Sequence, residues 1–293
     1  YVYDKLIDYL TEIFPKSKVL KLIGNQPINK LNKVKLPYHL GSMDKIKPGS
    51  RKLELWFNKF NIGPYVISDK LDGLSGLLVL EKDMQPALYT RGDGTYGQDI
   101  SHLLNIIGWK SNNKLNNKLP NKLSKLLEKE NKLIIRGEII INEETYEEKY
   151  SNQYTKSRSL IAGNVNSKPG KINKQIAADI EFISYQFVYP EMIRADDQFN
   201  LLKHYGLLVV NNTIFTESPK TQLDKILLER RNKSKYKIDG IIITDCNKSY
   251  INPTSGNPKH SIAFKMALSE QQSETVVKEV EYNISKNGIL KQI

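Results

Sequence analysis

Short apolar runs of strand length, separated by irregularly placed helical segments, are the feature that most constrains how this chain of 293 residues can fold. The strand-like runs lie at 74–81, 86–90, 133–141, 182–189, 207–211, 238–244 and 261–267. Apolar residues have helical spacing around 98–107, 121–130, 143–150, 196–205 and 220–231. Because strands dominate the middle of the chain and helices do not alternate with them regularly, the sequence predicts an α+β fold of antiparallel or mixed sheets flanked by helices.

The two ends of the chain differ from its middle. Residues 3–14 have the apolar spacing of a helix, and residues 24–50 are rich in Pro, Gly and Asn, which is typical of a linker that enters a new domain. Residues 275–290 are typical of a hairpin with a turn at Asn287-Gly288. The chain begins with Tyr1 rather than Met and stops soon after this hairpin, so we expect it to be an excerpt of a longer protein.

The composition restricts the compartment and the partners. A single cysteine, Cys246, excludes an internal disulfide framework and fits a reducing, intracellular compartment. No apolar run approaches the roughly 18 residues of a membrane span, so we expect no membrane contact and no secretion signal. The net charge of +12 fits a polyanionic partner, because neutralised phosphates release counterions; AT-biased coding of Lys, Asn and Ile fits the same composition equally well.

The stretch "VISDKLDGLSGLLVLEK" (66–82) contains an unusual pair of charges in a strand-like run. Lys70 and Asp72 are two residues apart and therefore share one face of an extended segment. Burying two such charges is costly unless partners stabilise them, and Gly73 allows another group to approach the backbone closely. A site is one explanation, but K-x-D-G alone is too short to be specific.

Other short motifs follow K-x-D-G along the chain. In order, the set is "KLDG" (70–73), "TRGDGTYGQD" (90–99), "IRGEI" (135–139), "FISYQF" (182–187), "KIDGIII" (237–243) and "AFKM" (263–266). Together these motifs resemble the nucleotidyltransferase (adenylation) domain of NAD-dependent DNA ligases, the type of bacteria and some large DNA viruses. The resemblance covers roughly residues 35–290, and "TRGDGTYGQD" is its most specific part because ATP-dependent ligases lack it.

The resemblance implies a role for each matched residue. The implied catalytic residues are Lys70 as the adenylated lysine, Asp72, Arg91 of R-G-D-G, Asp239 with Gly240 of the fourth motif, and Lys265 of the last. The implied nucleotide-binding residues are Ser68, Lys70, Leu71, Arg91, Glu138, Tyr185, Arg231 and Lys265. "YDKL" (3–6) resembles the segment of the family that binds the nicotinamide mononucleotide half of NAD, which implies that role for Tyr3 and Asp4.

Two further roles follow from the same resemblance. Tyr185 lies in an apolar strand and could stack its ring on adenine, although a core tyrosine fits the same pattern. "YTKSRSLIAGNVNS" (154–167) resembles a family stretch whose arginine is matched by Arg158, which is then a candidate contact to the phosphate at a DNA nick or to AMP. Seen without the family, Arg158 is a surface arginine.

The chemistry required of these residues is coherent. A lysine ammonium cannot attack phosphorus, and a nearby cation together with loss of water favours the free amine. Lys265 and a bound Mg²⁺ or Mn²⁺ could supply that charge, while arginines neutralise the charge that develops during phosphoryl transfer. Mg²⁺ prefers one or two carboxylates with phosphate oxygens, which makes Glu138 and Asp72 the candidate metal ligands.

Two positions depart from the family pattern. The family usually has a glutamate two residues before the nucleophile, where this chain has Ser68; Asp69 is adjacent but replaces it only if a bulge turns its side chain to the same face. The fourth motif of the family ends in lysine, where this chain has Thr244. Losing one electrostatic donor commonly costs about 10²–10³ in rate, so nucleotide binding is a firmer prediction than efficient turnover.

The predicted organisation and function are these. Residues 1–32 belong to a nicotinamide-mononucleotide-binding helical domain with its linker, 33–268 form the nucleotidyltransferase domain, and 269–293 begin an oligonucleotide-binding (OB) barrel. The chain, a monomer, takes AMP from NAD onto Lys70 as the first step in sealing nicked duplex DNA. The alternatives are an ATP-dependent DNA or RNA ligase or a capping-type nucleotidyltransferase, a nucleotide- or nick-binding module with impaired catalysis, and a basic RNA-binding protein with chance motifs.

Overall fold

A computed structural model describes residues 33–110, 119–266, 282–284 and 290–292, together with Tyr9, Leu10, Ile13, Phe14 and Ser17. The helices are α2 (Arg51–Lys59), α3 (Asn121–Glu130), α4 (Glu143–Lys149), α5 (Ser157–Val165), α6 (Lys174–Asp179), α7 (Ala195–His204) and α8 (Leu223–Lys233), with 3₁₀ turns η2 (Ser101–Leu103), η3 (Pro169–Lys171) and η4 (Lys220–Gln222). The strands are β1 (Lys33–Lys35), β2 (Asp44–Ile46), β3 (Tyr65–Leu71), β4 (Leu74–Glu81), β5 (Ala87–Thr90), β6 (Tyr96–Gln98), β7 (Lys132–Ile141), β8 (Ile180–Tyr189), β9 (Asn212–Phe215), β10 (Ile238–Asp245), β11 (Ser261–Phe264), β12 (Tyr282–Ile284) and β13 (Leu290–Gln292).

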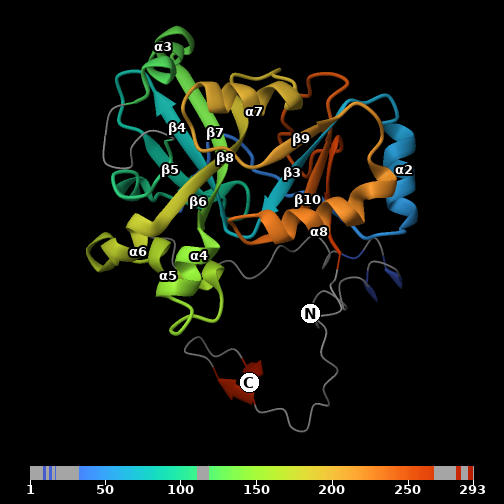
Figure 1. The fold of residues 1–293 in the computed structure, drawn as a ribbon. Coiled ribbons are helices and arrows are strands. Elements are labelled where there is room, and N and C mark those ends of the chain that lie inside the picture. Colours follow the sequence, from blue (N-terminus) through green and yellow to red (C-terminus); the bar gives the residue numbers. More distant parts are fainter. Residues whose placement is uncertain are drawn as a thin grey trace.

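Two larger sheets organise the part of the chain between β1 and β11. The five-stranded sheet has the order β2-β11-β10-β3-β9, and the four-stranded sheet has the order β5-β4-β7-β8. Neighbouring strands are antiparallel except for β2 and β11, which are parallel, so the predicted α+β fold with antiparallel or mixed sheets is confirmed. Figure 1 shows the two sheets side by side, with α8 next to β3 and β10 of the five-stranded sheet and α2 at the right of the view.

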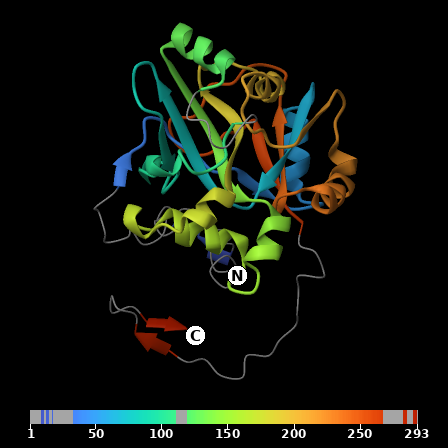
Figure 2. The ribbon, with the colours of Figure 1, turned by 60° about the vertical axis from the view of Figure 1, so that its left-hand side comes forward.

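One helix and one loop join the two sheets. Helix α7 contacts both β8 of the four-stranded sheet and β3 of the five-stranded sheet. The β10–β11 loop, residues 246–260, bonds to both sheets as well: Asn252 Nδ2 donates to the carbonyl of Val188 in β8 (3.3 Å), and Asn257 Nδ2 donates to Asp44 in β2 (2.7 Å). In Figure 2, turned by 60°, α7 is the gold helix at the top of the view, above the strands of the two sheets.

The four-stranded sheet is buried on both faces. Along β4, Leu78 and Leu80 belong to the main core, whereas Leu77 and Val79 belong to a second apolar cluster that contains Leu36, Leu40, Ile134 and Val188. Successive side chains of a strand point to opposite faces, and here both faces are buried. The sequence of this strand is therefore a continuous apolar run instead of an alternation of apolar and polar residues. A Cβ on Gly137 in β7 would lie 2.6 Å from the ring of Phe182, which explains the glycine in "IRGEI".

The five-stranded sheet is tied to α8 by a buried ion pair. Arg230 Nη1 on α8 lies 2.8 Å from Asp69 Oδ1 on β3, and neither residue is more than 8% exposed. The guanidinium also donates to the carbonyls of Ile67 (3.3 Å) and Asn211 (3.1 Å) and to the hydroxyl of Thr213 (2.7 Å). Burial raises the pKa of Asp69, and the bonds from Arg230 oppose that rise.

Most of the predicted elements are present, and two are wrong. The predicted strands at 74–81, 86–90, 133–141, 182–189, 238–244 and 261–267 correspond to β4, β5, β7, β8, β10 and β11. Residues 207–211 make only isolated bridges, Leu207 with Lys110 and Val209 with Ser184, because a single paired residue is too short for a ladder. Residues 98–107 contain the end of β6 and one 3₁₀ turn instead of a helix, since Asp99 bonds the backbone and hydroxyl of Ser101 and closes the chain into a turn.

Only part of what the sequence predicts for the two ends of the chain falls within the described residues. The predicted linker at 24–50 contains the short strands β1 and β2, which pair with β6 and β11. Strands β12 and β13 pair antiparallel, which confirms a hairpin, while Asn287 and Gly288 lie outside the described residues. Tyr3 and Asp4 also lie outside them.

Two expectations from the composition concern the single cysteine and membrane spans. Cys246 is fully buried, and burial raises the pKa of its thiol to about 12, so it is an unreactive core residue. Within the described ranges, every helix is too short or too polar to pass through a bilayer.

The buried ion pair generates a stability prediction. Arg230→Met leaves Asp69 without its cation in the interior, which we expect to lower the free energy of unfolding by about 3 kcal/mol in urea denaturation. Lys149→Met is the control, because Lys149 pairs with Asp179 at the surface and its loss should cost less than about 1 kcal/mol. Equal losses in the two variants would contradict a structural role for the buried pair.

Candidate active site

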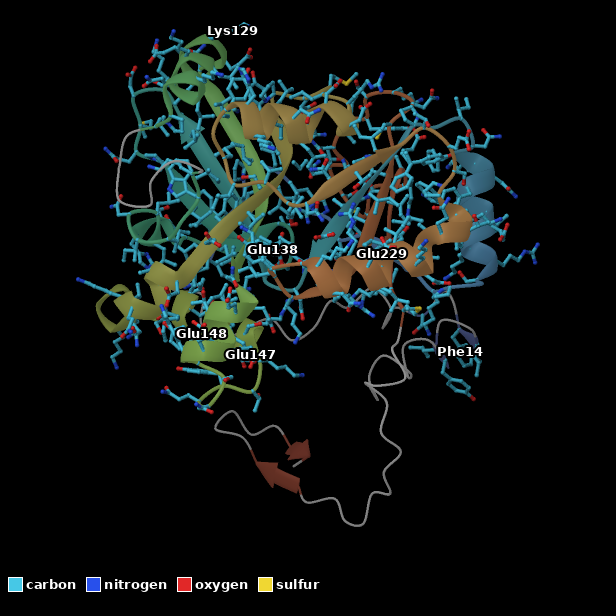
Figure 3. All side chains as sticks on the ribbon, in the orientation of Figure 1. Phe14, Lys129, Glu138, Glu147, Glu148 and Glu229 are labelled. Atoms are coloured by element: carbon cyan, nitrogen blue, oxygen red, sulfur yellow. The ribbon has the colours of Figure 1, made fainter. Side chains whose placement is uncertain are left out.

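A cleft of about 600 Å³ lies between the two sheets, and most of the predicted site residues line it. The five-stranded sheet contributes Ser68, Lys70, Leu71, Asp239, Thr244 and, just after β11, Lys265; the four-stranded sheet side contributes Arg91, Glu138 and Tyr185; α5 contributes Arg158. Residues far apart in the sequence therefore meet at one place. Figure 3 shows Glu138 in the interior of the fold, whereas Glu147 and Glu148 lie on α4 at its periphery.

Asp239 is shared by two lysines at the floor of this cleft. Lys70 Nζ lies 3.0 Å from Asp239 Oδ1 and 3.2 Å from Oδ2, and Lys265 Nζ donates to the same Oδ2. One carboxylate thus holds two ammonium groups together that would otherwise repel each other. The arrangement leaves a net positive charge beside Lys70, which suits a site that receives phosphate.

A β-bulge places Asp239 where it can make these contacts. In the pairing of β10 with β3, Ile238 lies opposite Leu71 and Gly240 lies opposite Lys70, so Asp239 is an extra residue between them. Bulges interrupt the alternation of a strand and re-aim a side chain, and they are common next to active sites. This bulge directs a carboxylate to the strand end that carries Lys70.

Glu138 is the most strongly perturbed group of the cleft. Its side chain is buried, and burial raises the pKa of its carboxyl to about 7, although Lys70, Arg136, Arg158 and Arg91 all act in the opposite direction. Among the described residues, no hydrogen bond or ion pair involves its carboxylate. Glu138 is therefore a carboxyl that titrates near neutrality, faces several cations and remains available to a ligand.

Two arginines flank the cleft from different elements. Arg91 follows β5 and donates from Nη1 to the hydroxyl of Ser42 (3.0 Å). The turn that presents it requires Gly92, which has φ +54° and where a Cβ would lie 1.9 Å from the carbonyl of Tyr96. Arg158 on α5 forms an ion pair with Asp72 (3.0 Å), so the Asp72 carboxylate is already neutralised by an arginine.

Tyr185 occupies a second bulge. In the pairing of β7 with β8, Arg136 lies opposite Gln186 and Gly137 opposite Ser184, so Tyr185 is the extra residue, and both Tyr185 and Gln186 line the cleft. The Tyr185 hydroxyl lies 2.9 Å from Ser75 Oγ, and its ring lies under Arg136 with 5.8 Å from the guanidinium carbon to the ring centroid. Burial raises the pKa of its phenol, so the ring is neutral.

The structure separates some predicted residues from the cleft. Arg231, predicted to bind nucleotide, lies on α8 and donates to the carbonyl of Met266 (3.2 Å) rather than lining the cleft. Asp69 could replace the family glutamate only across a bulge, but β3 keeps its register through Ser68 and Asp69, and the Asp69 carboxylate turns to Arg230. Asp93, which belongs to the same R-G-D-G motif as Arg91 but was given no predicted role, accepts hydrogen bonds from the backbone N–H groups of Thr95 and Tyr96 and stabilises the turn.

The two departures from the family pattern both lie in the cleft. Ser68 is buried there and has no carboxylate to offer. The Thr244 hydroxyl lies 2.8 Å from that of Ser261, and no lysine occupies its place. Sequence reasoning did not identify Arg136 or Gln186 as site residues, although "IRGEI" and "FISYQF" contain them; Asn252 had no motif to mark it.

Comparison with known proteins places this geometry in a family context. Residues 31–268 match the family described as "NAD-dependent DNA ligase adenylation domain". The chain is 43% identical to a DNA ligase of Acanthamoeba polyphaga mimivirus, covering 98% of this chain and 42% of that protein. It is 33% identical to DNA ligase homologue 205R of Invertebrate iridescent virus 6 (98% and 43% covered) and 24% identical to a DNA ligase of Brachyspira hyodysenteriae (99% and 45%). The chain thus spans less than half the length of these curated relatives.

The burial of Glu138 generates a pH prediction. Its pKa in the folded state, about 7, lies above the ordinary value of 4.5, so the folded chain binds the extra proton and loses stability as pH rises between these values. Glu138→Gln cannot ionise, and we expect its advantage in unfolding free energy over the parent chain to grow by about 2 kcal/mol from pH 5 to pH 8. Urea denaturation at both pH values measures this difference. Glu147→Gln, at an exposed position, should show no such trend, and a flat difference for Glu138→Gln would refute the perturbed carboxyl.

Proposed function

The chain belongs to the family of NAD-dependent DNA ligase adenylation domains, and we propose that it takes AMP from NAD onto Lys70, as the first step in sealing nicks in duplex DNA. The observation that best supports this proposal is the meeting of Lys70, Lys265 and Glu138 in one cleft, although they come from strands of two different sheets. A nucleophile, a cation and an available carboxyl within one cleft are what a phosphoryl-transfer site requires.

In the proposed step, Lys70 acts as the free amine. Its nitrogen attacks the adenylyl phosphorus of NAD, an N–P bond forms, and the P–O bond to nicotinamide mononucleotide breaks. The mononucleotide leaves with the bonding electron pair, and the proton of the lysine nitrogen passes to solvent. Lys265 and Arg91 lie where they can neutralise the negative charge on the non-bridging oxygens.

The residues present fit a divalent cation that arrives with the nucleotide. Within the described part of the chain, no group of three or more His, Cys, Asp or Glu side chains forms a metal cage. Asp72 is paired with Arg158 and Asp239 with two lysines, which leaves Glu138 as the carboxylate able to hold Mg²⁺ together with phosphate oxygens. Such an ion would add positive charge at the phosphate.

Arg158 and the net charge of +12 support DNA as the partner of the later steps. The Arg158 side chain is 53% exposed at the cleft, so its guanidinium can exchange Asp72 for a phosphate. The nicked duplex as substrate and the transfer of AMP to its 5′-phosphate belong to the proposed activity of the whole ligase.

A second candidate function rests on Ser68 and Thr244. Both lie in the cleft without the charged groups that the family pattern places there, which favours a domain that binds nucleotide but transfers it slowly. This alternative predicts tight NAD or AMP binding without a covalent adduct.

The proposed function predicts a covalent adduct between AMP and Lys70. Incubation of the chain with adenylate-labelled NAD and Mg²⁺ should leave label on the protein in a denaturing gel, and Lys70→Ala should abolish it because the nucleophile is gone. Lys203→Ala, at an exposed lysine of α7 away from the cleft, is the control and should label normally. Parallel incubation with ATP distinguishes an ATP-dependent enzyme. Label that survives in Lys70→Ala would overturn the proposal.

The departure at Thr244 predicts that a lysine at this position increases the rate of adduct formation. Thr244→Lys places a cation in the cleft and should raise the single-turnover rate of adduct formation by about 10²-fold if its absence limits the step. Thr244→Met, of similar length without the charge, is the matched comparison. Equal rates for the two variants would show that the departure at Thr244 does not impair the chemistry.

A further inference from the structure

The cleft has two ends of different chemical character. One end holds the charged groups around Lys70, Asp239 and Glu138. The other end, here named the uncharged end, is lined mostly by uncharged side chains, among them Val66, Ser68, Ile242, Thr244, Gln186 and Asn252. The Arg136 guanidinium lies opposite Gln186 and donates to the carbonyl of Gly41. Val66 is four residues before Lys70 on β3, so the uncharged end extends about 13 Å from the nucleophile.

This division matches the two parts of a nucleotide, given the proposed function. The charged end suits phosphates, and the uncharged end suits a flat heterocycle whose edge carries donors and acceptors. A site that discriminates between bases needs polar groups that are fixed in place but still have free hydrogen-bonding capacity. The polar side chains of the uncharged end can be compared on that basis.

Several of them already have hydrogen-bond partners within the protein. Ser68, for which the described residues give no partner, carries a single hydroxyl rather than a paired donor and acceptor. The hydroxyls of Thr244 and Ser261 bond to each other at 2.8 Å. Gln198, which lies nearby on α7, accepts from the backbone of Phe187 and donates to the carbonyl of Ile193, so its amide is used at both ends.

Gln186 is different. Because Tyr185 is an extra residue in the strand pairing, both Tyr185 and Gln186 line the cleft. The Nε2 of Gln186 donates to Asn252 Oδ1 at 2.5 Å. Asn252 is itself anchored, because its Nδ2 donates to the carbonyl of Val188. Among the described residues, no hydrogen bond uses Gln186 Oε1 or the second hydrogen of its Nε2.

We propose that Gln186, held in place by Asn252, reads the base of the nucleotide in this cleft and makes it selective for adenine. Its Oε1 accepts a hydrogen bond from the exocyclic 6-amino group, and the remaining Nε2 hydrogen donates to an adjacent ring nitrogen. An amide is suited to this edge because adenine presents one donor beside one acceptor, the pattern that Asn and Gln side chains match. A base with a 6-carbonyl group presents an acceptor to Oε1 and is rejected.

The test compares AMP with IMP, which differ in having an amino group or a carbonyl at position 6. Isothermal titration calorimetry on the full chain should show at least about 10-fold tighter binding of AMP, the equivalent of one well-placed hydrogen bond. Gln186→Met keeps the length of the side chain and removes both polar groups, so the two affinities should come within about twofold of each other. Gln186→Glu keeps the acceptor but loses both the Nε2 bond to Asn252 and the donor to the ring nitrogen, so it should retain only part of the preference for AMP.

Control variants separate base reading from a structural effect. Gln222→Met makes the same change at an exposed glutamine and should leave the AMP-to-IMP ratio at the parent value. Asn252→Ala frees the Gln186 amide and should lower the ratio partly, and it provides a second measurement if Gln186→Met does not fold. An unchanged ratio in the Gln186 or Asn252 variants would overturn the inference, as would failure of the parent chain to prefer AMP.

This experiment is independent of covalent chemistry. If the chain binds AMP with a Gln186-dependent preference but takes no label from NAD, the proposed adenylation fails and the base-reading role stands. If the chain takes label through Lys70 while Gln186→Met keeps the full preference for AMP, the base-reading role fails and the proposed function stands.

Discussion

Asp239 carries one negative charge between two ammonium groups, and the organisation of the cleft depends on that contact. Without it, Lys70 on β3 and Lys265 just after β11 would be two like charges on either side of β10, and they would repel each other. The carboxylate holds both at the floor of the cleft, next to the buried Glu138. The site thus has more cations than free carboxylates. Lysines neutralise the charge of Asp239, and burial raises the pKa of Glu138 to about 7.

The geometry that brings these groups together comes from irregular sheets rather than from loops. Asp239 and Tyr185 are each an extra residue in a strand pairing, one in the five-stranded sheet and one in the four-stranded sheet. A regular strand would place alternate side chains in the cleft and the rest in the core. The bulges add side chains to the cleft at two points, and a rigid sheet then holds them more firmly than a surface loop would.

The sequence predicted the architecture and the charged end of the cleft well, because both leave local signals. Strand-length apolar runs located most of the two sheets, and short motifs located Lys70, Arg91, Glu138, Asp239 and Lys265. Arg231, predicted to bind nucleotide, donates to the carbonyl of Met266 instead of lining the cleft, and the sequence alone does not show which way a residue of a helix points. Asn252 could not be found, since its role depends on a loop crossing to another sheet. Helix α5 was missed because it is only weakly amphipathic, and α6 because its six residues are too few to show a helical period.

The β10–β11 loop forms one wall of the cleft while also connecting two strands, and it is bonded to β8 through Asn252 and to β2 through Asn257. Trp56 of α2 donates to the carbonyl of Lys259 in the same loop (3.0 Å). Surface loops generally accept added or deleted residues at little cost. This one cannot, because a change of length between its two anchors would pull Asn252 away from Gln186. Within this lineage, the spacing from Asp245 to Ser261 should therefore vary less than the length of other connections of the domain.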